Sequence, residues 1–123
     1  MTYIVQALYC LLRTDWLMWR GGLPAVHNRL KQISSSAGGS SRFEAERMCR
    51  AVDIACVLYF KRALCLQRSA ATAMLLRHHR HPAELVIGAQ ILPFKAHAWV
   101  ELHGQVINDV PYISQLYREL ERC

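Results

Sequence analysis

The stretch that decides the fold runs from residue 61 to residue 109. It reads KRALCLQRSAATAMLLR (61–77), HHRHPAELVIGAQILPFK (78–95) and AHAWVELHGQVIND (96–109). Cys65 opens a predicted helix, His97 opens a predicted strand, and Asp109 closes the strand that follows. A thiol, an imidazole and a carboxylate in this order can act as nucleophile, general base and base-orienting acid. The stretch therefore indicates a small cysteine hydrolase acting on a peptide.

Periodicity in this stretch predicts an α+β fold. Residues 65–77 form a helix that is apolar on most of its surface, which is typical of a central helix. Residues 84–92 form the first strand, and residues 97–102 and 105–109 form a hairpin. Pro111 opens a closing helix with an apolar side made of Ile113, Leu116, Tyr117 and Leu120. The plan is a set of helices, one with the catalytic cysteine at its N-terminus, packed on a small antiparallel sheet.

The hairpin offers a geometric test of the His–Asp pair. A three-residue loop of Leu102, His103 and Gly104 would place Glu101 opposite Gln105. Counting back along the two strands then places His97 opposite Asp109. Side chains of directly opposed residues share a face of the sheet and can hydrogen-bond. Ala98, Val100 and Val106 would point into the core.

The first 60 residues predict helices that cover this core. Apolar residues recur at helical spacing as far as Gly21-Gly22, where the helix ends, and residues 24–33 form a second short helix. Ser41 and Glu44 make a capping-box pattern ahead of a helix that ends near Phe60. We expect one domain (1–123) made of an N-terminal helical arm (1–33), a flexible Ser/Gly linker (34–41) and a catalytic core (42–123).

The chain is basic, with 15 Lys and Arg against 9 Asp and Glu and a formal net charge of +6. This charge fits a solvated basic face, and it also fits recognition of an acidic peptide, an acidic partner protein or nucleic acid. No RNA-binding or zinc-finger signature accompanies the charge, so nucleic acid is not an expected partner. Residues 3–12 are apolar but too short to span a bilayer, which leaves a membrane-surface helix as an alternative.

The five cysteines, Cys10, Cys49, Cys56, Cys65 and Cys123, form no disulfide framework. Their odd number and the absence of a secretory signal predict a reducing, cytoplasmic location. No C-x-x-C pair is present, and the histidines at positions 78, 79 and 81 lie at a helix end without acidic or cysteine residues at ligand spacing. We therefore expect neither a metal nor a cofactor.

Two interpretations of Cys65 stay open at this point. A lone cysteine at a helix start is more often structural than catalytic, and a lone histidine on a strand is usually a satisfied polar residue. A helix N-terminus, however, stabilises a thiolate, and its N–H groups can bind the oxyanion of a tetrahedral intermediate. Gln67 and Arg68 are candidates for a second oxyanion donor and, with Trp99, for contacts to the substrate.

These residues resemble the lasso-peptide B proteins, leader peptidases with a transglutaminase-like, papain-related core. The resemblance rests on C-L-x-R-S (65–69), P-A-E-L-V-I-G (82–88), P-F-x-A-H-A-W-V-E (93–101) and G-x-V-x-N-D (104–109). It implies a cysteine protease that removes the leader from a ribosomally made precursor peptide before a separate ATP-dependent cyclase acts. On this resemblance Cys65 is the nucleophile, His97 the base and acid, and Asp109 the residue that fixes the imidazole tautomer.

The chain departs from the family in two places. Fused members carry a winged-helix-like leader-recognition domain, and this chain is too short for one, so we expect the split type with a separate recognition protein. Arg80 also stands where the family more often has glycine. The alternatives to leader removal are acyl transfer to an amine on the same triad, and a non-catalytic basic adaptor for a peptide or nucleic acid.

Overall fold

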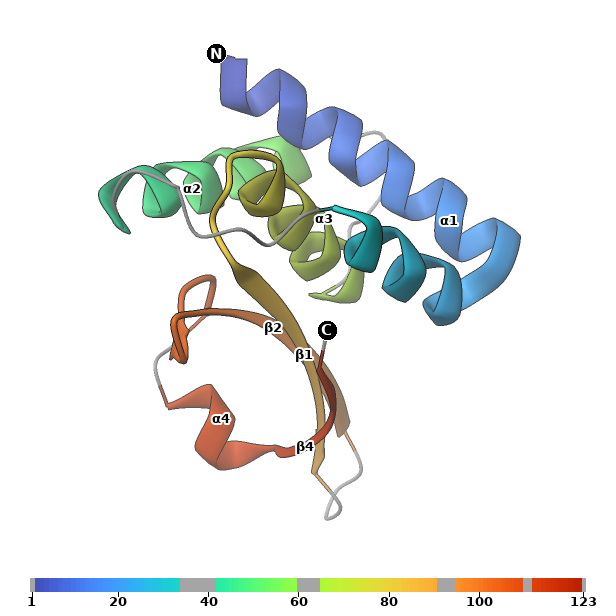
Figure 1. The fold of residues 1–123 in the computed structure, drawn as a ribbon, viewed down its shortest axis with the longest axis vertical. Helices are drawn as coiled ribbons and strands as arrows, with labels where there is room; N and C mark the ends of the chain where they lie inside the picture. Colours follow the sequence, from blue (N-terminus) through green and yellow to red (C-terminus); the bar gives the residue numbers. More distant parts are fainter. Residues whose placement is uncertain (1, 34–41, 60–64, 91–94, 110–111, 123) are drawn as a thin grey trace.

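In the computed structural model, three helices pack on one face of a four-stranded antiparallel sheet, and a short fourth helix lies against the other face (Figure 1). The structure describes residues 2–33, 42–59, 65–90, 95–109 and 112–122. Over these residues the predicted α+β class is confirmed. The predicted linker, with Ser41 of the capping box, lies outside the described residues.

Helix α1 (Thr2–Gln32) is two helical stretches that meet at Gly22. Gly22 has φ 68° and ψ −157°, a conformation that glycine adopts without the steric cost of a Cβ. Pro24 follows near the start of the second stretch, where a missing N–H costs little. The predicted break at Gly21-Gly22 is confirmed. No helix among the described residues combines the length and the hydropathy that crossing a membrane requires.

Helix α3 (Cys65–His78) is the centre of the helical layer, beside α1 and α2 (Arg42–Leu58) (Figure 1). Every residue from 69 to 77 is buried. Arg77 ties the layers together, because its guanidinium donates to the carbonyls of Leu30 in α1 and Ala83 in the first strand, at 2.6 and 2.8 Å. The central position predicted for this helix is confirmed, and its first residue is Cys65 as predicted.

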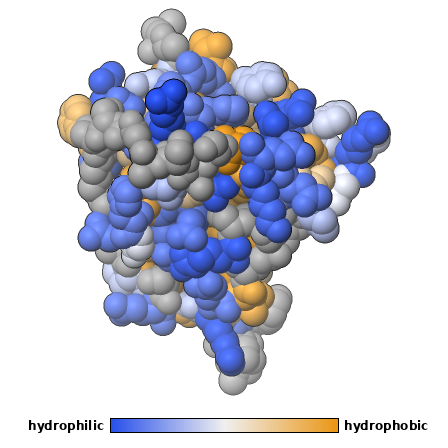
Figure 2. All heavy atoms as spheres, in the orientation of Figure 1, coloured by the Kyte–Doolittle hydropathy of each residue, from blue (hydrophilic) through white to orange (hydrophobic). Residues whose placement is uncertain are grey.

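The sheet has the strand order β3-β2-β1-β4. Its strands are β1 (Ala83–Gln90), β2 (Lys95–Leu102), β3 (Gln105–Val106) and β4 (Arg118–Arg122). Ala98 and Val100 pack into the main core with the helices, as predicted, whereas Trp99 and Val86 form a second cluster with Ile113 of α4 (Ile113–Leu116). Both faces of the central strands are therefore buried. The face that Figure 2 draws is mainly hydrophilic, with small separate hydrophobic patches.

The hairpin register differs from the prediction. Leu102 pairs with Gln105 and Glu101 with Val106, so the loop has two residues rather than three. His103 and Gly104 both have positive φ, 53° and 78°. Two consecutive positive φ values make a type I′ turn, whose twist matches that of the flanking strands. The tight turn shifts the register by one residue, so Val106 packs with the second cluster instead of the main core.

The predicted closing helix is wrong beyond its first turn. Residues 113–116 are helical, but 118–122 form the edge strand β4 paired with β1. Glu84 and Glu101 are directly opposed on β1 and β2, an arrangement that repels. The Arg122 guanidinium lies 3.2 Å from Glu84 and 3.0 Å from Glu101. An extended β4 therefore supplies the cation that these two carboxylates require.

Arg80 ends α3 in a conformation that favours glycine. Its φ is 66°. The Arg80 N–H donates to the Arg77 carbonyl at 3.0 Å and the His81 N–H to the Leu76 carbonyl at 2.9 Å. These two bonds make a Schellman cap, in which the left-handed residue is usually glycine. The position where this chain departs from the family is therefore one where a positive φ favours glycine, and Arg80 occupies it.

We expect Arg80→Gly to raise the free energy of unfolding by about 0.5–1 kcal/mol, because glycine adopts a positive φ without strain. Urea denaturation of the two proteins measures the difference. Arg80→Ala is the matched control, since alanine removes the side chain but keeps the Cβ. An equal gain from alanine would assign the effect to the arginine side chain and contradict the backbone explanation.

The histidines that follow α3 have separate partners. His79 Nε2 lies 2.6 Å from Gln6 Oε1 of α1, with its ring edge-on to Tyr3. His81 is buried and its Nε2 lies 3.2 Å from Glu44 Oε1 of α2. The two rings therefore fasten the end of α3 to two different helices.

Candidate active site

Cys65 is the first residue of α3 and carries a free thiol. It is half-buried and packs against the main core. The first N–H groups of a helix have no partner within the helix and point outward from its end. Cys65 therefore combines a thiol with backbone donors that can stabilise negative charge on the sulfur or on a bound carbonyl oxygen.

His97 of β2 is hydrogen-bonded to Asp109. The imidazole Nε2 lies 2.7 Å from Asp109 Oδ2, and the two side chains are 22% and 17% exposed. The carboxylate accepts from Nε2–H, which leaves Nδ1 as the basic nitrogen of the ring. The predicted contact between His97 and Asp109 is present. The strand register from which it was predicted is not, because Glu101 pairs with Val106 rather than with Gln105.

Asn108 explains how Asp109 reaches the histidine. Strand β3 ends at Val106, and the Ile107 N–H still donates to the Val100 carbonyl at 3.0 Å. One residue later the Asn108 side chain replaces the main chain, because its Oδ1 accepts the Val100 N–H at 2.7 Å. The main chain is thereby released from the ladder, and Asp109 lies beside His97 at the edge of β2.

Aromatic rings hold the imidazole from the other side. The ring of Tyr117 lies nearly parallel to that of His97, with centroids 5.4 Å apart, and the Trp99 ring is 6.3 Å away. Trp99 is itself fixed, because its Nε1–H donates to the buried Glu101 at 3.0 Å. Gly88, the cross-strand partner of His97, leaves room for these rings. The sequence indicated Gly88 only as part of a motif, and it placed Tyr117 in a helix rather than on the histidine.

We expect Gly88→Ala to lower the free energy of unfolding by about 1–3 kcal/mol through overpacking. A Cβ at this position would lie 2.7 Å from Trp99 Cη2 and 3.0 Å from Tyr117 Cβ. Chemical denaturation followed by tryptophan fluorescence measures both the loss and the displaced indole. Gly104→Ala is the control, since no atom lies within 4 Å of its Cβ and only its φ of 78° opposes the change. An unchanged indole spectrum in Gly88→Ala would contradict the packing.

Contacts of α3 with β2 and with the segment after β3 place its first turn near Asp109. Ser69 Oγ donates to the Ala98 carbonyl at 3.0 Å and accepts from Asn108 Nδ2, also at 3.0 Å. Cys65 lies one turn before Ser69 on the same side of the helix, a distance of about 5.4 Å along the axis. Arg68, one residue before Ser69, lies 3.9 Å from Asp109. The first turn of α3, which begins at Cys65, therefore lies near the His97–Asp109 pair.

The structure joins His97 to Asp109 but does not join the thiol to them. Among the described residues, no hydrogen bond connects Cys65 Sγ with the His97 imidazole. Hydrogen bonds between catalytic groups are often long in a free enzyme and tighten when the substrate binds. The arrangement thus supplies a base and its orienting acid beside the helix end that carries the thiol.

The three further residues predicted to contact the substrate lie in different surroundings. Arg68 lies 3.9 Å from Asp109 and 3.7 Å from Asp53, so its guanidinium bridges two carboxylates. Gln67, also in the first turn of α3, has a buried Oε1 with no partner among the described residues. Trp99 is only 1% exposed and lies behind His97, which favours a positioning role.

An open groove of about 500 Å³ adjoins Asp109. It lies between α2, α3 and the segment that follows β3, and most of its lining is charged or polar. The lining residues are Glu46, Cys49, Arg50, Asp53, Arg68, Ile107, Asn108 and Asp109. Burial raises the pKa of Asp53, and the neighbouring Arg68 partly offsets this effect. The groove can hold an extended polar chain next to the His–Asp pair.

Burial opposes ionisation of two of the other described cysteines and limits access to the third. Burial raises the pKa of the Cys10 thiol to about 11, and burial also raises that of Cys56. Cys49 is 7% exposed. We expect iodoacetamide to alkylate Cys65 faster than these three cysteines at neutral pH, as followed by peptide mass mapping. Equal rates at Cys65 and Cys56 would count against an activated thiolate.

The comparisons with known proteins identify the family of the chain. The model of the transglutaminase-like superfamily matches residues 8–122. The microcin J25-processing protein McjB of Escherichia coli is 49% identical over 47 residues, which are 38% of this chain and 23% of that protein. This match supports the resemblance that the sequence motifs indicated. No solved structure matches the chain. The chain belongs to the transglutaminase-like superfamily.

Proposed function

We propose that this protein is a cysteine peptidase that removes the leader from a ribosomally made lasso-peptide precursor. The observation that carries the proposal is the His97–Asp109 hydrogen bond of 2.7 Å near the first turn of a helix that begins with a cysteine. The similarity to a protein named for processing microcin J25 supports the same function. Cys65 is the nucleophile, His97 the general base and acid, and Asp109 the orienting residue.

In the proposed reaction, Cys65 Sγ attacks the carbonyl carbon of the last leader residue. The thiol proton passes to His97 Nδ1, and the N–H of Cys65 stabilises the oxyanion. The peptide C–N bond then breaks, and the imidazolium protonates the leaving amine of the core peptide. Water activated by His97 attacks the thioester, which releases the leader with a free carboxylate and restores the thiol.

Asp109 has a defined task in this scheme. By accepting from Nε2–H it holds the tautomer whose lone pair is on Nδ1, and it stabilises the imidazolium that forms. Tyr117 and Trp99 restrict the ring, and their role is positioning. Arg68 lies 3.9 Å from the same Asp109 oxygen, Oδ2, and adds a positive charge beside the carboxylate. The charged groove beside Asp109 is the proposed path of the leader.

The proposed partners follow from the family. They are the precursor's leader, a separate winged-helix-like leader-recognition protein and the ATP-dependent cyclase that uses the freed amine. The proposed location is the cytoplasm, which keeps the Cys65 thiol reduced.

The test is cleavage of a precursor by the purified chain with its recognition protein in water enriched in ¹⁸O. Hydrolysis predicts a free leader with one ¹⁸O atom in its terminal carboxylate and a core peptide with a free amine. The superfamily name favours acyl transfer as the second candidate, which would leave the leader linked to an amine without ¹⁸O. If the protein binds the precursor and the precursor stays intact, the result would support the non-catalytic adaptor instead.

A further inference from the structure

Helix α1 carries an apolar stripe on the side that faces away from the core. Its members are Val5, Tyr9, Leu12, Trp16 and Trp19, which are 64%, 59%, 51%, 44% and 82% exposed. The opposite side of the helix, with Ala7, Leu11 and Thr14, is fully buried. Large apolar side chains gathered on one surface mark an interaction site more often than scattered ones do.

The spacing of the stripe is that of a coiled-coil seam. Its members follow one another at intervals of four, three, four and three residues, which is the a/d pattern of a heptad repeat. At about 100° per residue they span only about 80° of the helix circumference. A seam this narrow fits the face of a second helix, whereas a helix lying in a bilayer buries a wider apolar face.

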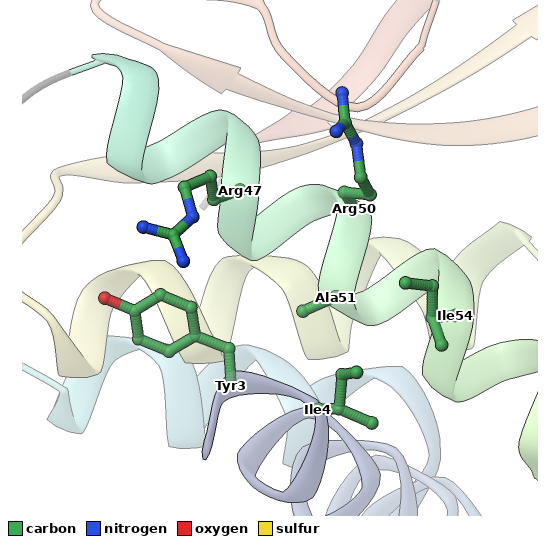
Figure 3. Close-up of a pocket in the computed structure, with 6 residues that line it drawn as sticks. All are labelled: Tyr3, Ile4, Arg47, Arg50, Ala51 and Ile54. Atoms are coloured by element: carbon green, nitrogen blue, oxygen red, sulfur yellow. The ribbon is translucent and has the colours of Figure 1, made fainter. Parts of the chain in front are cut away.

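A small pocket lies between α1 and α2 near the start of α1, and it is lined by none of the stripe residues. Its volume is about 170 Å³, and Ile4 of α1 lies close to Ala51 and Ile54 of α2 within it (Figure 3). Arg47 and Arg50 complete the lining with Tyr3, and the Arg47 guanidinium lies 5.9 Å from the Tyr3 ring. Among the described residues, neither arginine has a carboxylate partner. The Arg47 guanidinium lies toward Tyr3, whereas that of Arg50 points away from Tyr3 and Ile4 (Figure 3).

Basic groups also flank the stripe itself. The guanidinium carbons of Arg13 and Arg20 lie 5.3 and 5.2 Å from the centre of the Trp16 ring. Asp15 accepts a hydrogen bond from Tyr59, so the nearest acid on α1 is already engaged within the fold. Arg13 and Arg20 are seven residues apart and so lie on the same side of the helix. The surface thus combines an apolar seam with cations along one side.

We propose that the α1 stripe docks an amphipathic helix of a partner protein whose apolar seam is flanked by Asp and Glu on the side that faces Arg13 and Arg20. This inference goes beyond leader cleavage and does not depend on Cys65. The acidic flank pairs with Arg13 and Arg20, which lie beside Trp16 of the stripe. A second copy of this chain is disfavoured, because an antiparallel pairing of two α1 stripes would bring Arg13 and Arg20 of both copies together in a protein of net charge +6.

Two designed helical peptides test the proposal on the full-length protein. Both carry Leu at positions a and d, and one has Glu whereas the other has Lys at positions e and g. By isothermal titration at low salt, we expect the Glu peptide to bind at least about ten times more tightly than the Lys peptide. The double substitution Leu12→Ser and Trp16→Ser is expected to lower the affinity for the Glu peptide by about 30-fold. Arg13→Glu combined with Arg20→Glu is expected to remove the preference for Glu over Lys.

Leu120→Ser is the matched control, since this β4 side chain is also 64% exposed and apolar but lies outside the stripe. It is expected to leave peptide binding unchanged, and thermal melting checks that every variant is folded. Equal binding of the two peptides, or no binding of the Glu peptide, overturns the proposal. So does binding to phosphatidylglycerol vesicles without binding to the peptide, or dimerisation in sedimentation that the Leu12/Trp16 double variant abolishes. Loss of precursor cleavage on Cys65 substitution with peptide binding intact separates this inference from the proposed catalytic function.

Discussion

Cys65→Ala is expected to reduce precursor cleavage by at least about 10⁴-fold while precursor binding is retained. The substitution removes the only protein atom that forms a covalent bond with the scissile carbonyl carbon in the proposed scheme. Helix α3 keeps its first turn, because alanine is the best helix former and the side chain is only half-buried. Product formation followed by mass spectrometry, together with precursor binding by titration, measures both quantities.

Cys56→Ala is the matched control for this variant. Cys56 is also half-buried and free, but it lies in α2 and burial raises the pKa of its thiol. It is expected to retain cleavage within about twofold, since a surface or half-buried cysteine away from the reacting atoms has no role in the scheme. Loss of cleavage in Cys56→Ala with retention in Cys65→Ala would show that Cys65 is not the nucleophile and would contradict the proposal.

Asp109→Asn is expected to lower kcat by about 10³–10⁴-fold with little change in precursor binding. The amide of asparagine can donate to the ring nitrogen, which favours the opposite tautomer and removes the lone pair from Nδ1. The loss of kcat should lessen as pH rises and thiolate forms without help from the base. Steady-state kinetics across pH distinguishes this effect from a structural one, which would not vary with pH in this way.

Asp53→Asn provides the comparison for Asp109. Both carboxylates lie near Arg68, at 3.7 and 3.9 Å, but only Asp109 is hydrogen-bonded to His97. We expect Asp53→Asn to change kcat by less than about threefold. Equal losses in the two variants would mean that the acids act through Arg68 rather than through the imidazole.

The sequence was a good guide wherever a local signal decides the structure. The start of α3 at Cys65, the break at Gly22 and the central burial of α3 all follow from periodicity and from residues with special backbone preferences. Arg80, which stands where the family more often has glycine, proved to occupy a left-handed cap position. These features depend on interactions between residues close in the sequence, so the sequence of one segment is enough to predict them.

The features that failed depend on partners distant in the sequence. Residues 118–122 follow a helical apolar pattern through Leu120, yet they form β4 because β1 has an open edge and because Arg122 joins Glu84 to Glu101. The hairpin register depends on whether Leu102 belongs to the loop or to the strand, and the periodicity of the sequence does not decide this.

The contact between His97 and Asp109 was predicted from a strand register that the structure does not have. In the predicted register, Asp109 lies opposite His97 on a regular hydrogen-bonded ladder. In the structure the ladder ends at Val106, and Asn108 takes over its hydrogen bonds. Asn108 stands inside one of the family motifs, so its signal was available. Its role as a replacement for main-chain pairing becomes evident only when Ser69 and Val100 are seen beside it.

The measurement that tests the central claim most directly is mass spectrometry of the enzyme quenched in acid during turnover of a precursor. The account predicts a thioester between Cys65 and the leader, seen on the Cys65-containing peptide as the mass of the leader less one water, which forms and decays with cleavage. A precursor cleaved at full rate while Cys65 stays unmodified, or a leader adduct on another residue, would contradict it.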